Sequence, residues 1–113
     1  MKKTLTALPL VLAGPAFAEG QLNLYNWGNY TSPEMITKFE TETGIKVTIT
    51  DYDSNDTALA KIKAGGHGFD IVVPSGTYVP IFIGEGLLME SKPNEMANFK
   101  NMDPQWVDVE FDP

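Results

Sequence analysis

The sequence predicts an α/β domain built on a parallel β-sheet. Between residues 21 and 73, short apolar segments alternate with segments of helical periodicity, and glycine follows each helical segment. This alternation is typical of βαβ units, whose consecutive strands run parallel. Residues 69–73 are almost entirely apolar, as in strands that are buried on both faces. The chain has 113 residues and no cysteine, so disulfides are excluded.

The first eighteen residues have the features of a secretory signal peptide. Lys2-Lys3 supplies the positive n-region, residues 5–13 form a short apolar run, and Ala16–Ala18 is a small-x-small cleavage pattern. The run is shorter than the roughly 20 apolar residues that a membrane-spanning helix needs. We expect cleavage after Ala18, export to the periplasm, and a mature region at 19–113 without a lipid anchor.

Negative charge dominates the predicted mature region. Loss of the two lysines of the signal leaves six lysines and no arginine against fifteen acidic residues, a net charge of −9. A surface of this charge repels nucleic acid and anionic lipid, and it is compatible with a cationic partner. The composition therefore excludes nucleic acid as a partner.

The first predicted unit runs from a strand at 22–26 through a helix to a second strand at 45–50. Ser32 is suited to cap the N-terminus of the helix, and Pro33 fits its first turn. Gly44 is suited to end the helix as its C′ residue. The second strand has β-branched side chains at alternate positions, a pattern that favours a half-buried strand.

The second predicted unit is a helix followed by the apolar strand at 69–73. Asn55 or Asp56 is expected to cap the helix, which ends at Gly65-Gly66. Because the strand is almost entirely apolar, we expect it to be the central strand of the sheet, buried on both faces.

The pattern is weaker after the third strand. We expect a short helix at 78–84, a short extended segment at 87–89, and a turn or helix start at 101–106. The sequence from residue 98 onward is rich in Asp, Asn and Pro and shows no recognisable element. We interpret the chain as a fragment of a longer protein, and so few strands are expected to give marginal stability alone.

Candidate ligand residues follow the three predicted strands, because open parallel sheets bind ligands beyond the carboxyl ends of their strands. The segments 26–30, 51–55 and 74–78 are rich in aromatic and short polar side chains. The rings of Trp27 and Tyr30 are suited to an alkyl chain or an ammonium group, at about 0.5–2 kcal/mol for each cation–π contact. Packing over the sheet edge is an equally favoured role for these rings. The helix N-termini at this edge favour anions instead.

Other chemistries find less support. Asp51 and Asp53 are expected to be solvated turn residues, and no third ligand completes a metal site with them. Ser75 and His67, the only histidine, suggest an exported hydrolase as an alternative, but they lie at opposite ends of the third strand. We expect no catalytic residue, no metal and no cofactor.

Four sequence blocks, in their order and spacing, resemble the periplasmic spermidine/putrescine-binding proteins of ABC importers: Tyr25–Tyr30 (YNWGNY), Phe39–Val47, Asp53–Asn55 and Phe69–Ser75. The resemblance runs from about Leu22 to the segment 101–104. It implies a type II periplasmic binding-protein fold, with 19–113 as the N-terminal part of the first lobe. It also implies a monomeric binding protein, not an enzyme, with a polyamine ligand and a membrane permease as partner.

The resemblance also implies a ligand site. By position, Trp27 and Tyr30 match the ring pair that lines the polyamine cleft, and Ser75 matches a serine that contacts the ligand. The family usually has a small polar residue and an acid between the rings, and an aromatic residue two positions after the serine. This sequence departs from that pattern, so a different amine or organic nitrogen solute stays open as the ligand. The predicted ligand residues are Trp27, Gly28, Asn29, Tyr30, Ser75 and, one position beyond Thr77, Tyr78.

Overall fold

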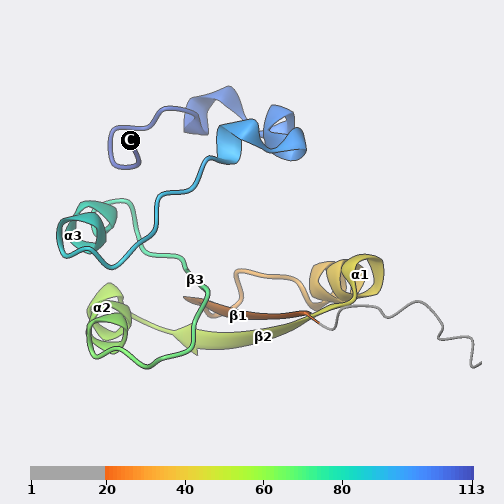
Figure 1. Ribbon diagram of the computed structural model, residues 1–113, viewed down its shortest axis with the longest axis horizontal. Coiled ribbons are helices and arrows are strands. Elements are labelled where there is room, and N and C mark those ends of the chain that lie inside the picture. Colours follow the sequence, from red (N-terminus) through yellow and green to blue (C-terminus); the bar gives the residue numbers. More distant parts are fainter. Residues whose placement is uncertain (1–19) are drawn as a thin grey trace, which may run out of the picture.

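The computed structural model describes residues 20–113, and the predicted signal peptide lies outside them. A three-stranded parallel sheet with the strand order β2-β1-β3 confirms the predicted α/β class (Figure 1). The elements are β1 (Gly20–Trp27), α1 (Pro33–Thr43), β2 (Ile45–Tyr52), α2 (Asn55–Lys63), β3 (Ile71–Val72) and α3 (Val79–Gly84). Among the described helices, none is long and apolar enough to cross a membrane.

The central strand is β1, and β3 lies at an edge of the sheet. β1 pairs with β2 along its whole length and with β3 through Leu24↔Ile71 and Tyr25↔Val72. The prediction of a central, fully buried strand at 69–73 is therefore wrong. Only two of its residues belong to a strand, and the side of β3 away from β1 pairs with no strand between residues 20 and 113. Ile71 is consequently 45% exposed.

α1 begins and ends where the sequence predicts. The Ser32 hydroxyl accepts a hydrogen bond from the backbone N–H of Met35 at 3.1 Å, which satisfies one of the free donors of the first turn. Gly44 has a φ of 71°, a conformation that glycine adopts without steric cost, and its N–H donates to the Glu40 carbonyl at 2.9 Å. Local sequence signals therefore determine both ends of this helix.

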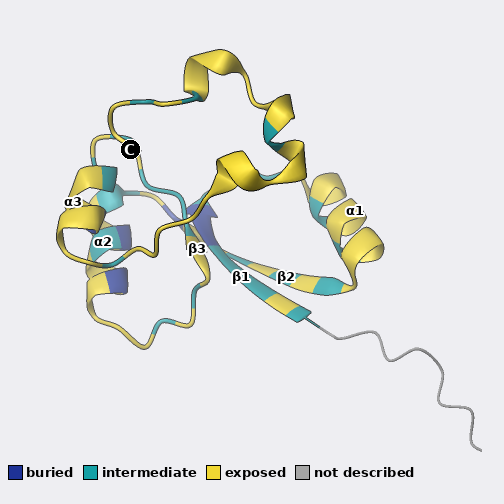
Figure 2. Ribbon diagram, turned by 45° about the horizontal axis from the view of Figure 1, so that its top comes forward, coloured by how far each residue is buried: buried dark blue, intermediate teal, exposed yellow. Residues whose placement is uncertain are grey.

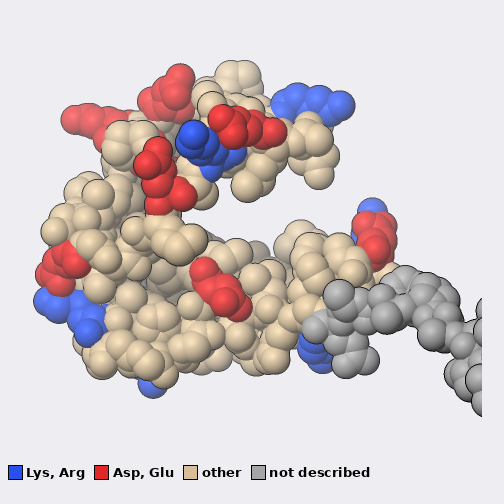
Figure 3. Space-filling model, viewed as in Figure 1, with Lys and Arg blue, Asp and Glu red and all other residues tan. Residues whose placement is uncertain are grey.

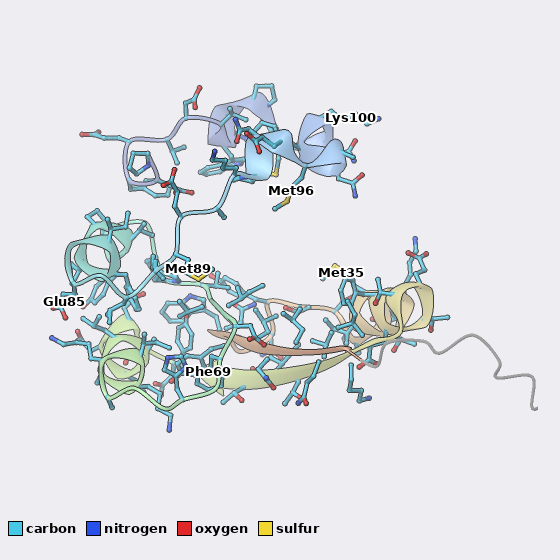
Figure 4. The ribbon with its side chains drawn as sticks, viewed as in Figure 1. Met35, Phe69, Glu85, Met89, Met96 and Lys100 are labelled. Atoms are coloured by element: carbon cyan, nitrogen blue, oxygen red, sulfur yellow. The ribbon has the colours of Figure 1, made fainter. Side chains whose placement is uncertain are left out.

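One face of α1 forms an apolar groove with the sheet. The groove has a volume of about 190 Å³ and is lined by Leu22, Leu24, Met35, Ile36, Phe39 and Val47. The described residues do not cover it: Met35 is exposed, and Figure 2 shows much of the surface of α1 as exposed. In Figure 4, the side chain of Met35 projects from α1 on the side of the C-terminal turns.

α2 is capped by Ser54, not by Asn55 or Asp56 as predicted. Ser54 has the extended backbone that an N-cap requires, and its hydroxyl accepts from the Thr57 N–H at 3.1 Å. Asn55 is thereby the first helical residue, and its amide group reaches across to the segment after β3. The Asn55 Oδ1 accepts from the Ser75 N–H at 2.9 Å, and its Nδ2 donates to the Ser75 Oγ at 3.0 Å.

The core of the described domain lies between the sheet, α2 and α3. Its buried residues are Tyr25, Tyr52, Ala58, Ile62 and Phe82. Tyr25 meets Tyr52 edge-on, with ring centroids 4.6 Å apart, and stacks on Phe69 at 4.3 Å. Figure 4 shows Phe69 in the lower part of the molecule, among the side chains of the sheet region. Because Tyr25 and Tyr52 lie near the carboxyl ends of their strands, this core supports the edge where a ligand is expected.

Beyond α3 the described chain contains only 3₁₀ turns: η1 (Pro93–Glu95), η2 (Ala97–Asn101) and η3 (Pro104–Trp106). The predicted extended segment at 87–89 does not join the sheet, and Met89 within it is 93% exposed. Near the end of the chain the ring of Phe111 packs over Gly76, where an added Cβ would lie 3.1 Å from the ring. The last residues therefore return to the segment that follows β3.

Glu40 connects the end of α1 to β2. Its Oε1 accepts a hydrogen bond from the Val47 N–H at 2.8 Å and lies 3.3 Å from the ammonium nitrogen of Lys46. The Val47 hydrogen bond, assisted by the Lys46 charge, holds the pKa of Glu40 below its ordinary value of 4.5, although desolvation acts in the opposite direction. The ionised form of Glu40 is therefore the one that stabilises the fold.

We expect Glu40→Ala to lower the unfolding temperature at neutral pH. Because the folded-state pKa is depressed, the contribution of the carboxylate is present above the unfolded-state pKa of about 4.5 and is lost as the pH falls through the folded-state pKa. The difference between wild type and variant should therefore shrink in acid. Thermal unfolding followed by circular dichroism across this range measures it. Glu42→Ala is the control, because Glu42 lies 3.8 Å from an exposed Lys38; a pH-dependent loss of the same size in the control contradicts the prediction.

Candidate ligand-binding site

The carboxyl ends of the three strands lie at one edge of the sheet. β1 and β2 end together at the pair Trp27↔Tyr52, and the Val73 N–H, just after β3, donates to the Tyr25 carbonyl at 3.2 Å. The parallel topology therefore brings together the segments that follow the strands, as the sequence predicts. Figure 1 shows α2 and α3 near this end of the sheet and α1 near the opposite end.

Two side chains from neighbouring strands donate to one backbone carbonyl at this edge. The indole Nε1 of Trp27 donates to the Val73 oxygen at 2.8 Å, and the hydroxyl of Tyr52 donates to the same oxygen. Burial raises the pKa of Tyr52 above its usual 10.0, which favours the protonated hydroxyl that donates this hydrogen bond. Because the Trp27 N–H is occupied within the fold, the face of the indole, and not its polar atom, is the part that is free to contact a ligand.

Asn26 holds the turn that follows β1. This buried side chain donates to the Thr31 hydroxyl at 3.2 Å and accepts from the backbone N–H of Trp27 at 2.8 Å. Asn29 has a φ of 63°, in the left-handed region that asparagine tolerates better than most residues. The turn places the exposed ring of Tyr30 with its centroid 6.3 Å from that of Trp27.

An open crevice of about 600 Å³ lies against these rings. It is lined by Trp27, Gly28, Tyr30, Asp51, Tyr52, Asp53 and Thr57. The rings of Trp27 and Tyr52 lie 4.8 Å apart and tilted by 59°, so part of the crevice is aromatic, whereas Asp51, Asp53 and Thr57 make another part polar. Its volume is that of a small-molecule site, and its lining suits a ligand with an apolar body and cationic ends.

The charge distribution agrees with this interpretation. Figure 3 shows acidic side chains on both sides of the hollow between the sheet region and the C-terminal turns, whereas most basic side chains lie at the outer rim in this view. Clefts with one sign of charge raise the local concentration of ligands of the opposite sign. The described surface therefore favours the approach of a cation to this side of the molecule.

The structure brings three of the six predicted ligand residues together in the crevice: Trp27, Gly28 and Tyr30. The other three are not among its lining residues. Asn29 is exposed in the turn, Ser75 binds Asn55, and the Tyr78 hydroxyl donates to the Asp56 carboxylate at 2.7 Å, a bond that raises the pKa of Tyr78.

Sequence reasoning missed four lining residues: Asp51, Tyr52, Asp53 and Thr57. For Asp51, Tyr52 and Asp53, the position at or directly after the end of the second strand was the available signal, since it assigned them to the correct edge, whereas Thr57 lies within α2 and had no such signal. The side-chain pattern did not distinguish ligand residues from the solvated turn that the sequence predicts for Asp51 and Asp53.

His67 has a structural environment. Its Nδ1 accepts from the Phe69 N–H at 2.9 Å, and its ring stacks on that of Phe69 at 5.5 Å. It precedes β3 and Ser75 follows it, so the two are at opposite ends of the strand, which disfavours the hydrolase alternative. Between residues 20 and 113, no group of three or more potential metal-ligating residues is arranged to hold a metal ion.

Tyr52→Phe tests how much the hydrogen bond from the Tyr52 hydroxyl to the Val73 carbonyl contributes to stability. Removing the hydroxyl deletes one hydrogen bond but leaves the Val73 oxygen paired with Trp27, so we expect a loss of about 0.5–1.5 kcal/mol in the free energy of unfolding, measured by urea denaturation. Tyr30→Phe is the matched control, because the Tyr30 hydroxyl makes no hydrogen bond to any residue from 20 to 113. Equal stability of all three proteins would show that the bond contributes nothing.

Curated proteins of one kind are similar to this chain in sequence. The spermidine/putrescine-binding periplasmic protein of Escherichia coli is 41% identical over 93 residues, which cover 81% of this chain and 27% of the relative. The putrescine-binding periplasmic protein SpuD of Pseudomonas aeruginosa is 41% identical over 104 residues, covering 88% of this chain and 28% of the relative. No family model matches the chain.

Solved structures give the same result. A putative spermidine/putrescine ABC transporter protein from Listeria monocytogenes has a TM-score of 0.77 at 44% identity, covering 83% of this chain and 29% of that one. The spermidine/putrescine ABC transporter substrate-binding protein PotD from Streptococcus pneumoniae has a TM-score of 0.78 at 37% identity, covering 84% and 29%. The described fold thus occurs as part of experimentally known binding proteins.

The fold of residues 20–113 is that of part of the solute-binding proteins of ABC transporters. The curated relatives are periplasmic binding proteins by name, and not enzymes. The chain is a homologue of the spermidine/putrescine-binding periplasmic proteins, of which it spans about a quarter of the length, 27% for the relative from Escherichia coli.

Proposed function

We propose that the protein is the extracytoplasmic solute-binding component of an ABC importer, which binds a polyamine such as spermidine or putrescine and delivers it to a membrane permease. Export to the periplasm through a signal peptide cleaved after Ala18 and action as a monomer belong to the same proposal. The observation that carries it is the crevice, whose aromatic and acidic lining matches the chemistry of an alkyl polyammonium ion, in a homologue of named polyamine-binding proteins.

The aromatic part of the crevice suits the alkyl chain of a polyamine. The faces of Trp27 and Tyr30, whose ring centroids lie 6.3 Å apart, offer apolar surface to the methylene groups and negative ring faces to an ammonium group. The hydrogen bond to Val73 holds the indole in place before a ligand arrives. Such preorganisation reduces the conformational entropy that binding costs.

The acidic part of the crevice offsets the positive ends of the helix dipoles. α2 begins two residues after Asp53, and its N-terminus carries a partial positive charge that disfavours a cation. Asp51 and Asp53 bring two carboxylates to the same edge. Full negative charges outweigh the half charge of a helix terminus, so the net field at this edge favours a cation.

Ser75, Asn29 and Tyr78 remain proposed ligand contacts. The Ser75 hydroxyl accepts a hydrogen bond from Asn55. Its second lone pair can accept another hydrogen bond, from an ammonium group of the ligand. A different amine or organic nitrogen solute is the second candidate, favoured by the neutral Gly28-Asn29 pair between the rings. Thermal-shift measurements with a panel of amines separate the two candidates, because only a ligand that binds the folded state raises the melting temperature.

Calorimetric titration of the full-length mature protein with spermidine and putrescine tests the proposal. We expect binding that weakens with added salt, and a loss of about 1–3 kcal/mol, roughly 5- to 150-fold in Kd, on Trp27→Ala. Trp27→Phe keeps an aromatic face and should bind more tightly than Trp27→Ala. Trp106→Ala is the control, because Trp106 lies in η3, outside the crevice, and is 59% exposed.

An absence of binding heat with either amine would refute the polyamine ligand. Wild-type affinity in Trp27→Ala would remove the indole from the site and leave the ligand class intact.

A further inference from the structure

Asp51 occupies a distinctive place in the crevice. It is the last residue but one of β2 and pairs with Asn26 of β1, so its side chain leaves the sheet beside the turn after β1. A Cβ built on Gly28 would have the Asp51 Oδ2 as its only neighbour within 4 Å, at 3.8 Å. The carboxylate of Asp51 therefore lies next to the backbone of Gly28. Gly28 directly follows Trp27 in the sequence.

The fold makes no use of this carboxylate within residues 20–113. Asp70 accepts a hydrogen bond from the Asn23 N–H at 2.7 Å, and Asp56 accepts one from Tyr78. The side chain of Asp51, by contrast, takes part in no hydrogen bond or ion pair among these residues, although its backbone belongs to the β1–β2 ladder. Its neighbour Asp53 directly precedes the N-cap Ser54, where a negative charge favours the start of α2. Asp51 is thus the lining carboxylate that no described feature of the fold requires.

We propose that Asp51 binds a primary ammonium group of the ligand, while the rings of Trp27 and Tyr30 hold the adjoining methylene groups. This inference rests on the proposed function and adds to it a residue and a chemical selectivity. A primary ammonium carries three N–H donors and no acceptor, so it needs oxygen acceptors at the end of an apolar slot. Because Gly28 has no side chain, no Cβ occupies the space beside the carboxylate, in the crevice that Trp27 also lines.

The arrangement distinguishes a primary ammonium from a quaternary one. Both carry one positive charge and both favour aromatic faces. A quaternary ammonium has no N–H to donate, so the interaction with Asp51 would be purely coulombic and would act in an exposed crevice, where such attraction is weak. Asp51 therefore makes the site selective for amines with free N–H donors.

Calorimetric titration of full-length wild type, Asp51→Asn and Asp51→Glu tests this inference. The probes are putrescine and the same diamine with both nitrogens fully methylated. We expect Asp51→Asn to weaken putrescine binding by about tenfold or more, since hydrogen bonds to charged groups are the stronger ones. The preference for putrescine over its methylated form should fall in the same variant, and Asp51→Glu should restore part of it. Glu42→Gln, an equal charge change on α1 far from the crevice lining, should change neither value.

The outcomes separate this inference from the function on which it rests. Wild-type affinity and selectivity in Asp51→Asn, with putrescine still bound, would overturn the role of Asp51 alone. An equal loss in Glu42→Gln would also overturn it, because the effect would then belong to overall charge. Failure of the wild type to bind any amine would refute the proposed function and this inference together. Matching unfolding temperatures of the variants exclude a loss of fold as the cause.

Discussion

The carbonyl oxygen of Val73 is the atom on which the geometry of the crevice depends. It accepts hydrogen bonds from Trp27 at the end of β1 and from Tyr52 at the end of β2, although Val73 itself follows β3. The backbone hydrogen bonds between the strands end at this edge. Beyond it, the side chains of Trp27 and Tyr52 connect the three strands through the Val73 carbonyl. Because both polar groups are satisfied inside the fold, the rings present fixed apolar faces, and a ligand need not organise them.

Local sequence signals made α1 predictable. The order of the strands in the sheet was not predictable from the sequence. Ser32 and Gly44 specify the two ends of the helix through contacts within a few residues, which a sequence displays directly. The apolar strand at 69–73 was expected at the centre because its composition suits burial on both faces. Its place is decided by which other strands pair with it, a long-range property, and in the described residues β1 takes the centre instead.

The candidate site also has residues that the sequence predicts and contacts that it does not predict. Trp27 and Tyr30 were predictable, because parallel topology places the residues after a strand at a known edge. The two hydrogen bonds between Asn55 and Ser75 were not predictable, because they depend on the position of the helix cap at Ser54. A shift of the cap by one residue changes Asn55 from a local cap into a bridge across 20 residues of sequence. Asp51 was placed at the right edge, but the sequence does not show that its side chain has no partner among residues 20–113; this requires the positions of the neighbouring loops.

If the crevice binds a polyamine as proposed, its openness in residues 20–113 has a consequence for the first step of binding. A ligand that rests against one wall keeps water on its other side, so it need not lose its whole hydration shell in the first step. Long-range attraction by the acidic surface governs that encounter, and its rate then responds to ionic strength more than the contact geometry does. Dehydration of a bound ammonium group would then be a separate, later step, and the contacts made after it would set the residence time. For such a ligand, association and retention would depend on different physical forces, and a substitution in the crevice could change one without the other.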